Sequence, residues 1–224
     1  ILTDGNAHGL MLVFHGATLP RGWERMYPNF MSTEAGMASE MLIFSQDFAD
    51  REARNSTVYP FTRNAVAAFD YGPLVLNRSF HREAGKGNKR RTTDAFQLAT
   101  TVLYQSPLQH FGLTPNNLTE QPAFVIDFLR QVPAVWDETR YLAGYPGKDI
   151  ALARRHADRW YLAVTNGEQK KKELTLTVPM LRGRTLTLIH DQADGTAAKR
   201  PLTVGPEGTI QLSLEIGGGA VLFD

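Results

Sequence analysis

The pattern of apolar residues changes near residues 132–137, and this change limits the possible folds more than any other feature of the sequence. Before it, short apolar runs alternate with loops and with stretches of helical periodicity. After it, apolar and polar residues alternate in short runs that turn residues separate. The first pattern is typical of βα units and the second of antiparallel sheet. We therefore expect an α/β chain with two domains, residues 1–132 and residues 133–224.

The first domain is expected to contain short strands and helices in rotation. The run GLMLVFHG at residues 9–16 is compact and apolar, as a buried parallel strand is. Further strands are expected at residues 29–33 and within residues 61–71, and helices at residues 38–48, 94–111 and 123–129. Thr93 and Asp94 are suited to cap the longest of these helices. In βα units the functional side chains lie at the carboxyl ends of the strands.

The second domain reads as a series of short antiparallel strands, at residues 149–155, 159–165, 173–178, 185–190, 209–214 and 219–223. Asn166-Gly167 and Asp194-Gly195 lie between such runs, and Asn-Gly is the dipeptide that type I′ hairpin turns favour. We expect a hairpin at Asn166-Gly167. A β-domain of about 90 residues has the size of a β-sandwich.

Composition excludes several classes of function. The net charge is +1, which argues against a nucleic-acid or anionic-membrane partner. The chain has no cysteine, so it has neither disulfides nor thiolate metal sites. The basic run GKGNKRR at residues 85–91 lacks the interleaved aromatic residues of a nucleic-acid site and is interpreted as a solvated loop. The chain starts at Ile1 without a signal sequence, and we expect it to be part of a longer protein.

Polar side chains with catalytic potential are densest between residues 14 and 40. Glu34 follows directly on a predicted strand, where a barrel places catalytic groups. Glu34 and Glu40 can converge through a turn and then serve as ligands of a hard cation or as an acid. From composition alone, a surface position for the two carboxylates stays open, as does a purely structural role for His15. The cluster consists of His15, Arg21, Trp23, Arg25, Tyr27, Asn29, Glu34 and Glu40.

Four strings in this sequence resemble motifs of glycoside hydrolase family 97. FHGATLPRGWERMYPN at residues 14–29 is similar to the family pattern FHG-x-x-x-P-x-G-x-x-R-x-YPN, and Glu34 and Glu40 follow it as an E-x5-E segment. PFTRN at residues 60–64 and DYGP at residues 70–73 resemble its PFTRN and DYTP strings. VPAVWDET at residues 132–139 resembles the P-x-x-WDET that opens its C-terminal β-domain. Gly72 replaces the usual Thr, and AGMAS at residues 35–39 replaces a GVRG-like segment.

The resemblance implies a fold and a set of roles. Family members have an N-terminal β-super-sandwich, a central (β/α)8 TIM barrel and a C-terminal β-domain, with a calcium ion beside the substrate. This chain would then be a partial (β/α)8 barrel followed by an antiparallel β-sandwich. Glu40 matches the general acid, which also touches the calcium region, and Glu34 matches a calcium ligand. His15, Arg21, Arg25, Tyr27 and Asn29 would bind the substrate or brace its pocket, and Arg63 and Asn64 would support it.

The same resemblance bears on stereochemistry, substrate and compartment. Inverting members carry Glu directly after the FH pair, whereas this chain has Gly16, as retaining members do. We expect a retaining, calcium-dependent α-galactosidase-like hydrolase of terminal α-glycosidic bonds, periplasmic or secreted, that acts on α-linked oligosaccharides. Its Asp nucleophile would lie upstream of Ile1, so this chain alone is expected to be inactive. The alternatives are an inverting α-glucosidase, or an inactive carbohydrate-binding or interaction fragment. Asp4 and Asp70 are interpreted as a turn residue and a loop cap.

Overall fold

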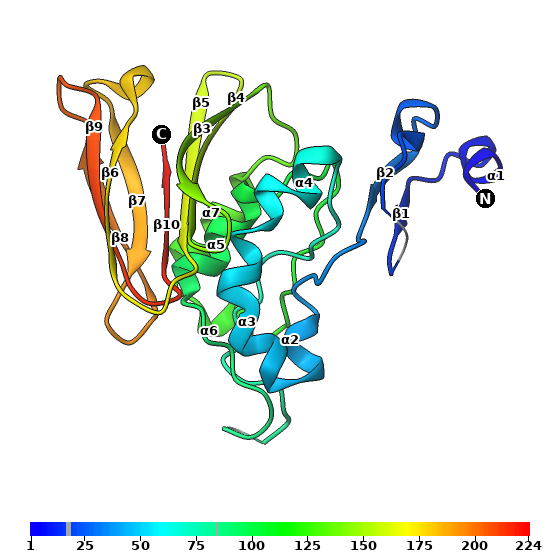
Figure 1. Cartoon of the computed structure of the whole chain (residues 1–224), viewed down its shortest axis with the longest axis horizontal. Helices are drawn as coiled ribbons and strands as arrows, with labels where there is room; N and C mark the ends of the chain where they lie inside the picture. The colour runs from blue at the N-terminus through cyan, green and yellow to red at the C-terminus, as the bar shows by residue number, and fades with distance from the viewer. Residues whose placement is uncertain (17–18, 84) are drawn as a thin grey trace.

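The computed structural model describes residues 1–16, 19–83 and 85–224, and its largest element is a six-stranded antiparallel sheet of order β3-β4-β5-β10-β7-β8. The strands β4 (Asp149–His156), β5 (Arg159–Asn166), β7 (Thr185–Asp191) and β10 (Gly219–Phe223) lie where the sequence predicts them. β6 (Lys172–Thr177) and β9 (Thr209–Leu214), also predicted, pair with each other in a second sheet that covers one face of the first. The C-terminal part is thus mostly antiparallel β-sheet (Figure 1).

The two edge strands of the large sheet, β3 (Glu138–Tyr145) and β8 (Ala197–Thr203), were not expected from the sequence. β3 is interrupted by a register shift between Tyr141 and Ala143, which disturbs the alternation of side chains. β8 contains Lys199, Arg200 and Pro201, and proline is confined to the edges of sheets. Such residues are tolerated at a sheet edge because one side of the strand has no partner strand.

The expected hairpin at Asn166-Gly167 is wrong. β5 ends at Asn166, and the chain then crosses to β6 in the other sheet. The amide of Asn166 donates to the carbonyls of Lys170 and Glu215, which ties this crossover to the turn that follows β9. A Cβ on Gly167 would lie 2.7 Å from Thr57 Oγ1, so close packing requires this glycine. Asp194-Gly195 does form the turn between β7 and β8.

Helices cover the other face of the large sheet. α5 (Asp94–Leu103) begins where predicted, because the Thr93 hydroxyl accepts a hydrogen bond from the Phe96 amide at 3.1 Å. It ends at Leu103 and does not extend to residue 111 as expected. α7 (Ala123–Gln131) packs beside it, and α6 (Asn117–Glu120) is a single turn between them. One apolar core lies between these helices and the sheet, and a second fills the space between the two sheets.

The N-terminal part contains shorter elements than the sequence predicts. Ser45 has an extended backbone and divides the helix expected at residues 38–48 into α2 (Met41–Phe44) and α3 (Gln46–Ser56). Residues 61–71 do not form a strand: they contain the end of a 3₁₀ turn (Tyr59–Phe61), α4 (Arg63–Val66) and one parallel bridge, from Phe69 to Thr33. Arg63, near the start of this segment, turns inward to bind backbone carbonyls, and a strand cannot form around it.

β1 (Leu12–Phe14) and β2 (Phe30–Thr33), both predicted, pair in parallel and stand with α1 (Leu2–Ala7) at one end of the molecule (Figure 1). Across the described residues, parallel pairing is limited to this pair and the bridge at Phe69. The partial barrel therefore stays a prediction. None of the described helices is long and apolar enough to cross a membrane.

Candidate active site

Three consecutive extended segments end at the same place and present their next side chains to one another. β1 is followed by His15, β2 by Glu34, and the bridge residue Phe69 by Asp70. The Glu34 amide donates to the Phe14 carbonyl at 2.9 Å, and the Asp70 amide donates to the Thr33 carbonyl at 3.0 Å. Parallel pairing thus aligns the three side chains at the carboxyl ends of the segments, as it does in βα folds.

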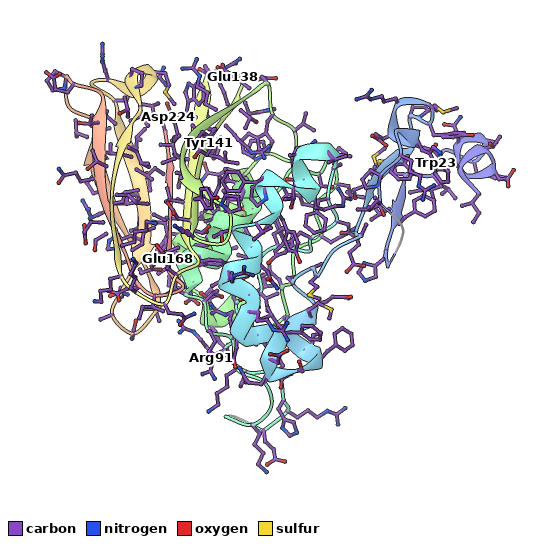
Figure 2. All side chains as sticks on the ribbon, viewed as in Figure 1. Trp23, Arg91, Glu138, Tyr141, Glu168 and Asp224 are labelled. Atoms are coloured by element: carbon purple, nitrogen blue, oxygen red, sulfur yellow. The ribbon has the colours of Figure 1, made fainter. Side chains whose placement is uncertain are left out.

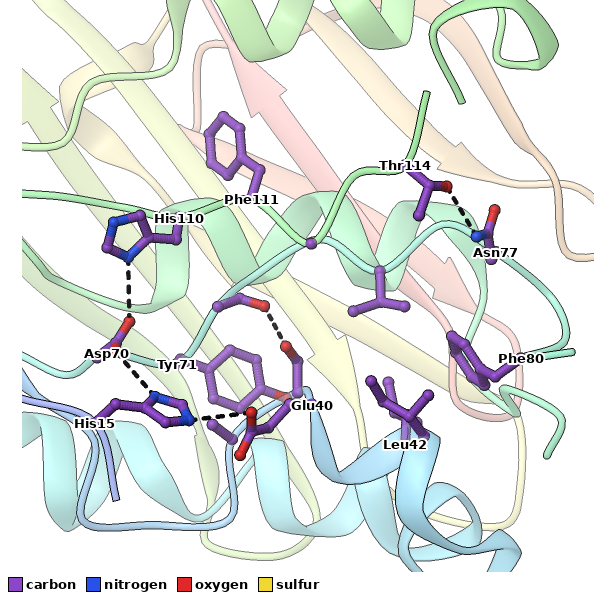
Figure 3. A pocket seen from close by; sticks show the side chains of 16 residues that line it. His15, Glu40, Leu42, Asp70, Tyr71, Asn77, Phe80, His110, Phe111 and Thr114 are labelled. Atoms are coloured by element: carbon purple, nitrogen blue, oxygen red, sulfur yellow. Dashed lines mark hydrogen bonds and ion pairs between the residues drawn. The ribbon is translucent and has the colours of Figure 1, made fainter. Parts of the chain in front are cut away.

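Glu40 reaches the same cluster from the turn that precedes α2. The Ser39 amide donates to the Tyr71 carbonyl at 3.0 Å, which holds this turn beside Asp70. The His15 ring then lies between carboxylates: its Nε2 is 3.0 Å from Glu40 Oε2, and its Nδ1 is 3.4 Å from Asp70 Oδ2 and 3.5 Å from Glu34 Oε2 (Figure 3). Glu34 is buried and accepts the Gly16 amide at 2.6 Å, whereas the Glu40 side chain is 38% exposed.

The charges around His15 favour its protonated form. Burial of the ring is the largest influence and acts to lower its pKa. The hydrogen bond to Asp70, the charges of Glu34 and Glu40 and the hydrogen bond to Glu40 together outweigh it, so the pKa of His15 is raised above its ordinary value. Three carboxylates, those of Glu34, Glu40 and Asp70, lie around the His15 ring, and the cluster therefore suits a cation or a proton shared with the imidazole.

A cavity of about 490 Å³ opens beside this cluster (Figure 3). His15, Glu40, Asp70 and His110 lie at one end of it. The wall beyond Glu40 is mainly apolar and contains Leu42, Ile43, Val75, Phe80 and Phe111. A concave site with an apolar wall and a few converging polar groups is the usual form of a small-molecule site.

The side chains of this cluster provide some of the ligands that a hard cation needs. Ligand atoms of His15, Glu34 and Glu40 lie within 4.8 Å of one another. Carboxylate oxygens are the ligands that calcium prefers, whereas an imidazole nitrogen suits transition metals better. Calcium takes about 6–8 oxygen ligands. Glu34 and Glu40 therefore fit a calcium site as two of its ligands, with His15 as a neighbour, and further oxygens would have to complete it.

The other predicted substrate-binding residues lie away from this cavity. Arg21 lines a separate, small depression with Phe14 and Trp23, and Trp23 is half exposed at the outer end of the molecule (Figure 2). Arg25 and Tyr27 lie in the loop around a 3₁₀ turn (Trp23–Arg25). None of these side chains lines the cavity beside Glu40. Their role in substrate binding stays a prediction.

Asn29, predicted to bind substrate, braces the backbone in this chain. Its amide group donates to the carbonyls of Leu2 and Leu10, at 3.0 and 3.2 Å. It thereby fixes α1 and the approach to β1 against the start of β2. Binding of substrate by Asn29 stays a prediction, whereas these two hydrogen bonds are structural.

Arg63 and Asn64 hold the backbone around the site through hydrogen bonds. The buried Arg63 guanidinium donates to the carbonyls of Thr33 and Glu34, at the end of β2, and to those of Ala67 and Ala68. Asn64 exchanges hydrogen bonds with the backbone of Gln105. Arg63 thus joins the backbone that carries Glu34 to the segment that leads to Asp70.

From the sequence, Asp70 was not assigned to the site and His110 was not considered. Asp70 was interpreted as a loop cap, but its carboxylate lies between His15 and His110, whose Nδ1 is 3.6 Å from Asp70 Oδ1. The available signal was its position directly after an extended segment. His110 lies in the loop after α5, and nothing in its sequence context indicates a site.

Residues 135–223 match the sequence profile described as glycosyl-hydrolase 97 C-terminal, oligomerisation. Over 222 residues the chain is 32% identical to a probable retaining alpha-galactosidase of Streptomyces bingchenggensis (strain BCW-1), covering 98% of this chain and 32% of that protein. The resemblance to the C-terminal region of glycoside hydrolase family 97 is confirmed. The retaining alpha-galactosidase of Bacteroides thetaiotaomicron is 28% identical, over 95% of this chain and 33% of that protein. This family 97 region thus spans about a third of the length of its curated relatives.

Solved structures agree with this placement. A crystal structure of a beta-arabinopyranosidase matches 100% of the family 97 region with 48% identity and a TM-score of 0.96, covering 36% of that chain. A glycoside hydrolase family 97 enzyme from Pseudoalteromonas sp. strain K8, as an R171K variant, shares its fold, with 21% identity and a TM-score of 0.81, over 99% of this chain and 36% of that one. The same enzyme has been solved in complex with acarbose.

Proposed function

We propose that this chain is the C-terminal part of a retaining glycoside hydrolase that cleaves terminal α-galactosides. The observation that carries the proposal is the meeting of Glu40, on the turn before α2, with Glu34 and His15, at the ends of two parallel strands, beside a cavity. Two relatives named as retaining alpha-galactosidases support the substrate. β1, β2 and the bridge at Phe69 would be closing units of a (β/α)8 barrel, with the domain boundary near residue 133.

A second substrate deserves a test because of one similar structure. A β-L-arabinopyranoside has the ring configuration of an α-D-galactopyranoside and lacks only the hydroxymethyl group. The similar beta-arabinopyranosidase is 48% identical to this chain. One site can therefore accept both sugars, and the contacts around the hydroxymethyl group would decide between them. No observation at the site favours the inverting α-glucosidase, because residue 16 is Gly and not Glu.

In this proposal Glu40 performs the proton transfers. In its protonated form Glu40 donates a proton to the departing glycosidic oxygen, and as a carboxylate it then takes a proton from the water that releases the sugar. The family resemblance assigns the nucleophile to an Asp upstream of Ile1. His15 lies 3.0 Å from the Glu40 carboxylate and orients it. The apolar wall beyond Glu40 would exclude water around the leaving group.

Glu34 and Glu40 would hold calcium, with His15 beside it. When bound, the ion would polarise the site and contact sugar hydroxyls. Arg21, Arg25, Tyr27 and Asn29 would complete or brace the pocket in the whole protein. The whole protein would act in the periplasm or outside the cell.

Kinetics of the full-length parent protein test this function. We expect hydrolysis of aryl α-galactoside or aryl β-L-arabinopyranoside, loss of activity with a chelator and recovery with Ca²⁺. Glu40→Gln should lower kcat/KM about 10²–10⁴-fold for substrates with poor leaving groups, the usual range for general acid catalysis. Glu83→Gln, at an exposed ion pair that does not line the cavity, is the matched control. Full activity of Glu40→Gln, or a preference for α-glucoside, would refute the proposal.

A further inference from the structure

His15 faces a carboxylate at each of its ring nitrogens. Nδ1 makes a hydrogen bond of 3.4 Å with Asp70 Oδ2, and Nε2 lies 3.0 Å from Glu40 Oε2 (Figure 3). Glu34 Oε2 also lies 3.5 Å from Nδ1, but that oxygen already accepts the Gly16 amide at 2.6 Å. The ring thus connects Asp70 on one side to Glu40 on the other.

Asp70 is fixed more firmly than His15. Its side chain is 10% exposed, against 55% for His15. Its amide donates to the Thr33 carbonyl at 3.0 Å, which ties its backbone to the end of β2. On the far side of the carboxylate, His110 Nδ1 lies 3.6 Å from Oδ1. Asp70 can therefore hold the imidazole in place, whereas the exposed ring has few other contacts to fix it.

We propose that Asp70 is a positioning residue that sets the tautomer and orientation of His15, and through it the direction of the Glu40 carboxyl group. A neutral imidazole has one N–H donor and one acceptor nitrogen. A carboxylate accepts only, so when Glu40 is protonated Asp70 keeps the proton of neutral His15 on Nδ1 and leaves Nε2 as the acceptor. Nε2 can then accept a hydrogen bond from protonated Glu40. The role given to Glu40 rests on the proposed function, but the acceptor that Asp70 offers to Nδ1 does not.

The matched variants are Asp70→Asn and Asp70→Ala. The amide oxygen of Asn can still accept from Nδ1–H, whereas Ala removes the acceptor. Removing the partner that orients a functional histidine typically costs about 10–100-fold in activity. In the full-length parent we expect kcat to fall by this factor in Asp70→Ala with little change in KM, and Asp70→Asn to recover most of it. Asp127→Asn, at an exposed ion pair on α7, is the control.

The tautomer is measured directly on this chain, by ¹⁵N NMR of the imidazole nitrogens at alkaline pH without added metal. All variants carry Glu40→Gln, whose neutral amide replaces the carboxylate that would compete for the proton at Nε2. His15→Gln assigns the signals by their loss, and circular dichroism shows that each variant is folded. We expect Nδ1–H with Asp70 in place and with Asp70→Asn, and a mixture of tautomers with Asp70→Ala. An Nε2–H tautomer with Asp70 in place, or the same single tautomer in folded Asp70→Ala, overturns the proposal.

The two proposals fail separately. If the tautomer depends on Asp70 and Glu40→Gln keeps full activity in the parent, the proposed function is refuted and the link from Asp70 to His15 stands. If Glu40 is essential and Asp70→Ala has unchanged kcat and an unchanged tautomer, the positioning role is refuted and the proposed function stands.

Discussion

At the scale of single residues, buried polar groups join segments that are distant in sequence. Glu52 is buried, and its carboxyl group accepts hydrogen bonds from the Thr92 hydroxyl at 2.7 Å and from the Gln97 amide at 2.6 Å. Burial raises the pKa of Glu52 above its ordinary value, although these hydrogen bonds and the charge of Arg90 oppose the rise. Such a network is stable only when each member has a partner. It connects α3 to the start of α5.

Asp191, at the end of β7, is the residue from which we predict a pH dependence of stability. Burial raises the pKa of Asp191 to about 6, although hydrogen bonds from Thr93 and the Gly219 amide oppose the rise. A carboxyl group with a raised pKa in the folded state stabilises the fold fully below its unfolded pKa of about 3.9. That contribution is lost as the pH rises to about 6. Ionisation of Asp191 thus lowers the free energy of unfolding by up to about 3 kcal/mol.

Asp191→Asn tests this linkage. We expect the variant to lose the part of the pH dependence of the free energy of unfolding that falls between about pH 4 and pH 6, and to be more stable than the unmodified protein at pH 7. The measurement is urea unfolding followed by circular dichroism across this pH range. Asp158→Asn, at an exposed turn, should behave as the unmodified protein does. A pH dependence that is identical in Asp191→Asn would refute the assignment to Asp191.

At the scale of elements, the β3–β4 hairpin depends on one glycine. Gly144 has φ +130° in β3, opposite Ile150 in β4. A Cβ at this position would collide with the Asp149 carbonyl oxygen and would lie 2.8 Å from Ile150 Cα. Both obstacles are backbone atoms, so the strand would have to move.

We therefore expect Gly144→Ala to lower the free energy of unfolding by about 2–3 kcal/mol, the sum of a strained φ and a steric shift. Gly205→Ala is the matched control, because Gly205 has open space around its Cβ position and no positive φ. That substitution should be neutral or slightly stabilising, since it lowers the entropy of the unfolded chain. Equal melting temperatures for the two variants would contradict the role given to Gly144.

Sequence patterning predicts these elements well where one face of a strand is buried. It predicts them poorly where tertiary contacts determine the local structure. β9 alternates exposed and buried residues, and β5 and β10 are continuous apolar runs, so all three were predictable. Residues 61–71 were predicted to contain a strand because the binding of four backbone carbonyls by Arg63 is invisible in sequence. For the same reason Asp70 read as a loop cap, since only the bridge between Phe69 and Thr33 brings it to His15. The meeting of His15, Glu34 and Glu40 followed from strand ends and the family resemblance.

At the scale of the whole molecule, burial is distributed unevenly. The large sheet is covered by α5 and α7 on one face and by β6 and β9 on the other (Figure 1). Among the described residues, the apolar core begins at Ala38. The large apolar side chains before that point are half-buried or exposed, and the exposed ones are Ile1, Leu10, Met11, Leu19, Trp23, Met26 and Met37. This surface is what the proposed barrel would bury, since adjacent βα units pack against one another.

This asymmetry predicts how local stability varies along the chain. A segment with few buried apolar contacts opens at low free energy, whereas the central strands open only with global unfolding. In native-state hydrogen exchange of this chain, we expect the amides of β1 and β2 to exchange at least about 100-fold faster than those of β5, β10 and α5. This factor corresponds to a difference of about 3 kcal/mol in the free energy of opening. In the full-length parent the same β1 and β2 amides should become protected, because the apolar side chains around them would be covered. Uniform protection across the isolated chain would show that residues 1–34 have a stable core of their own, and would remove the structural argument for a barrel partner at this end.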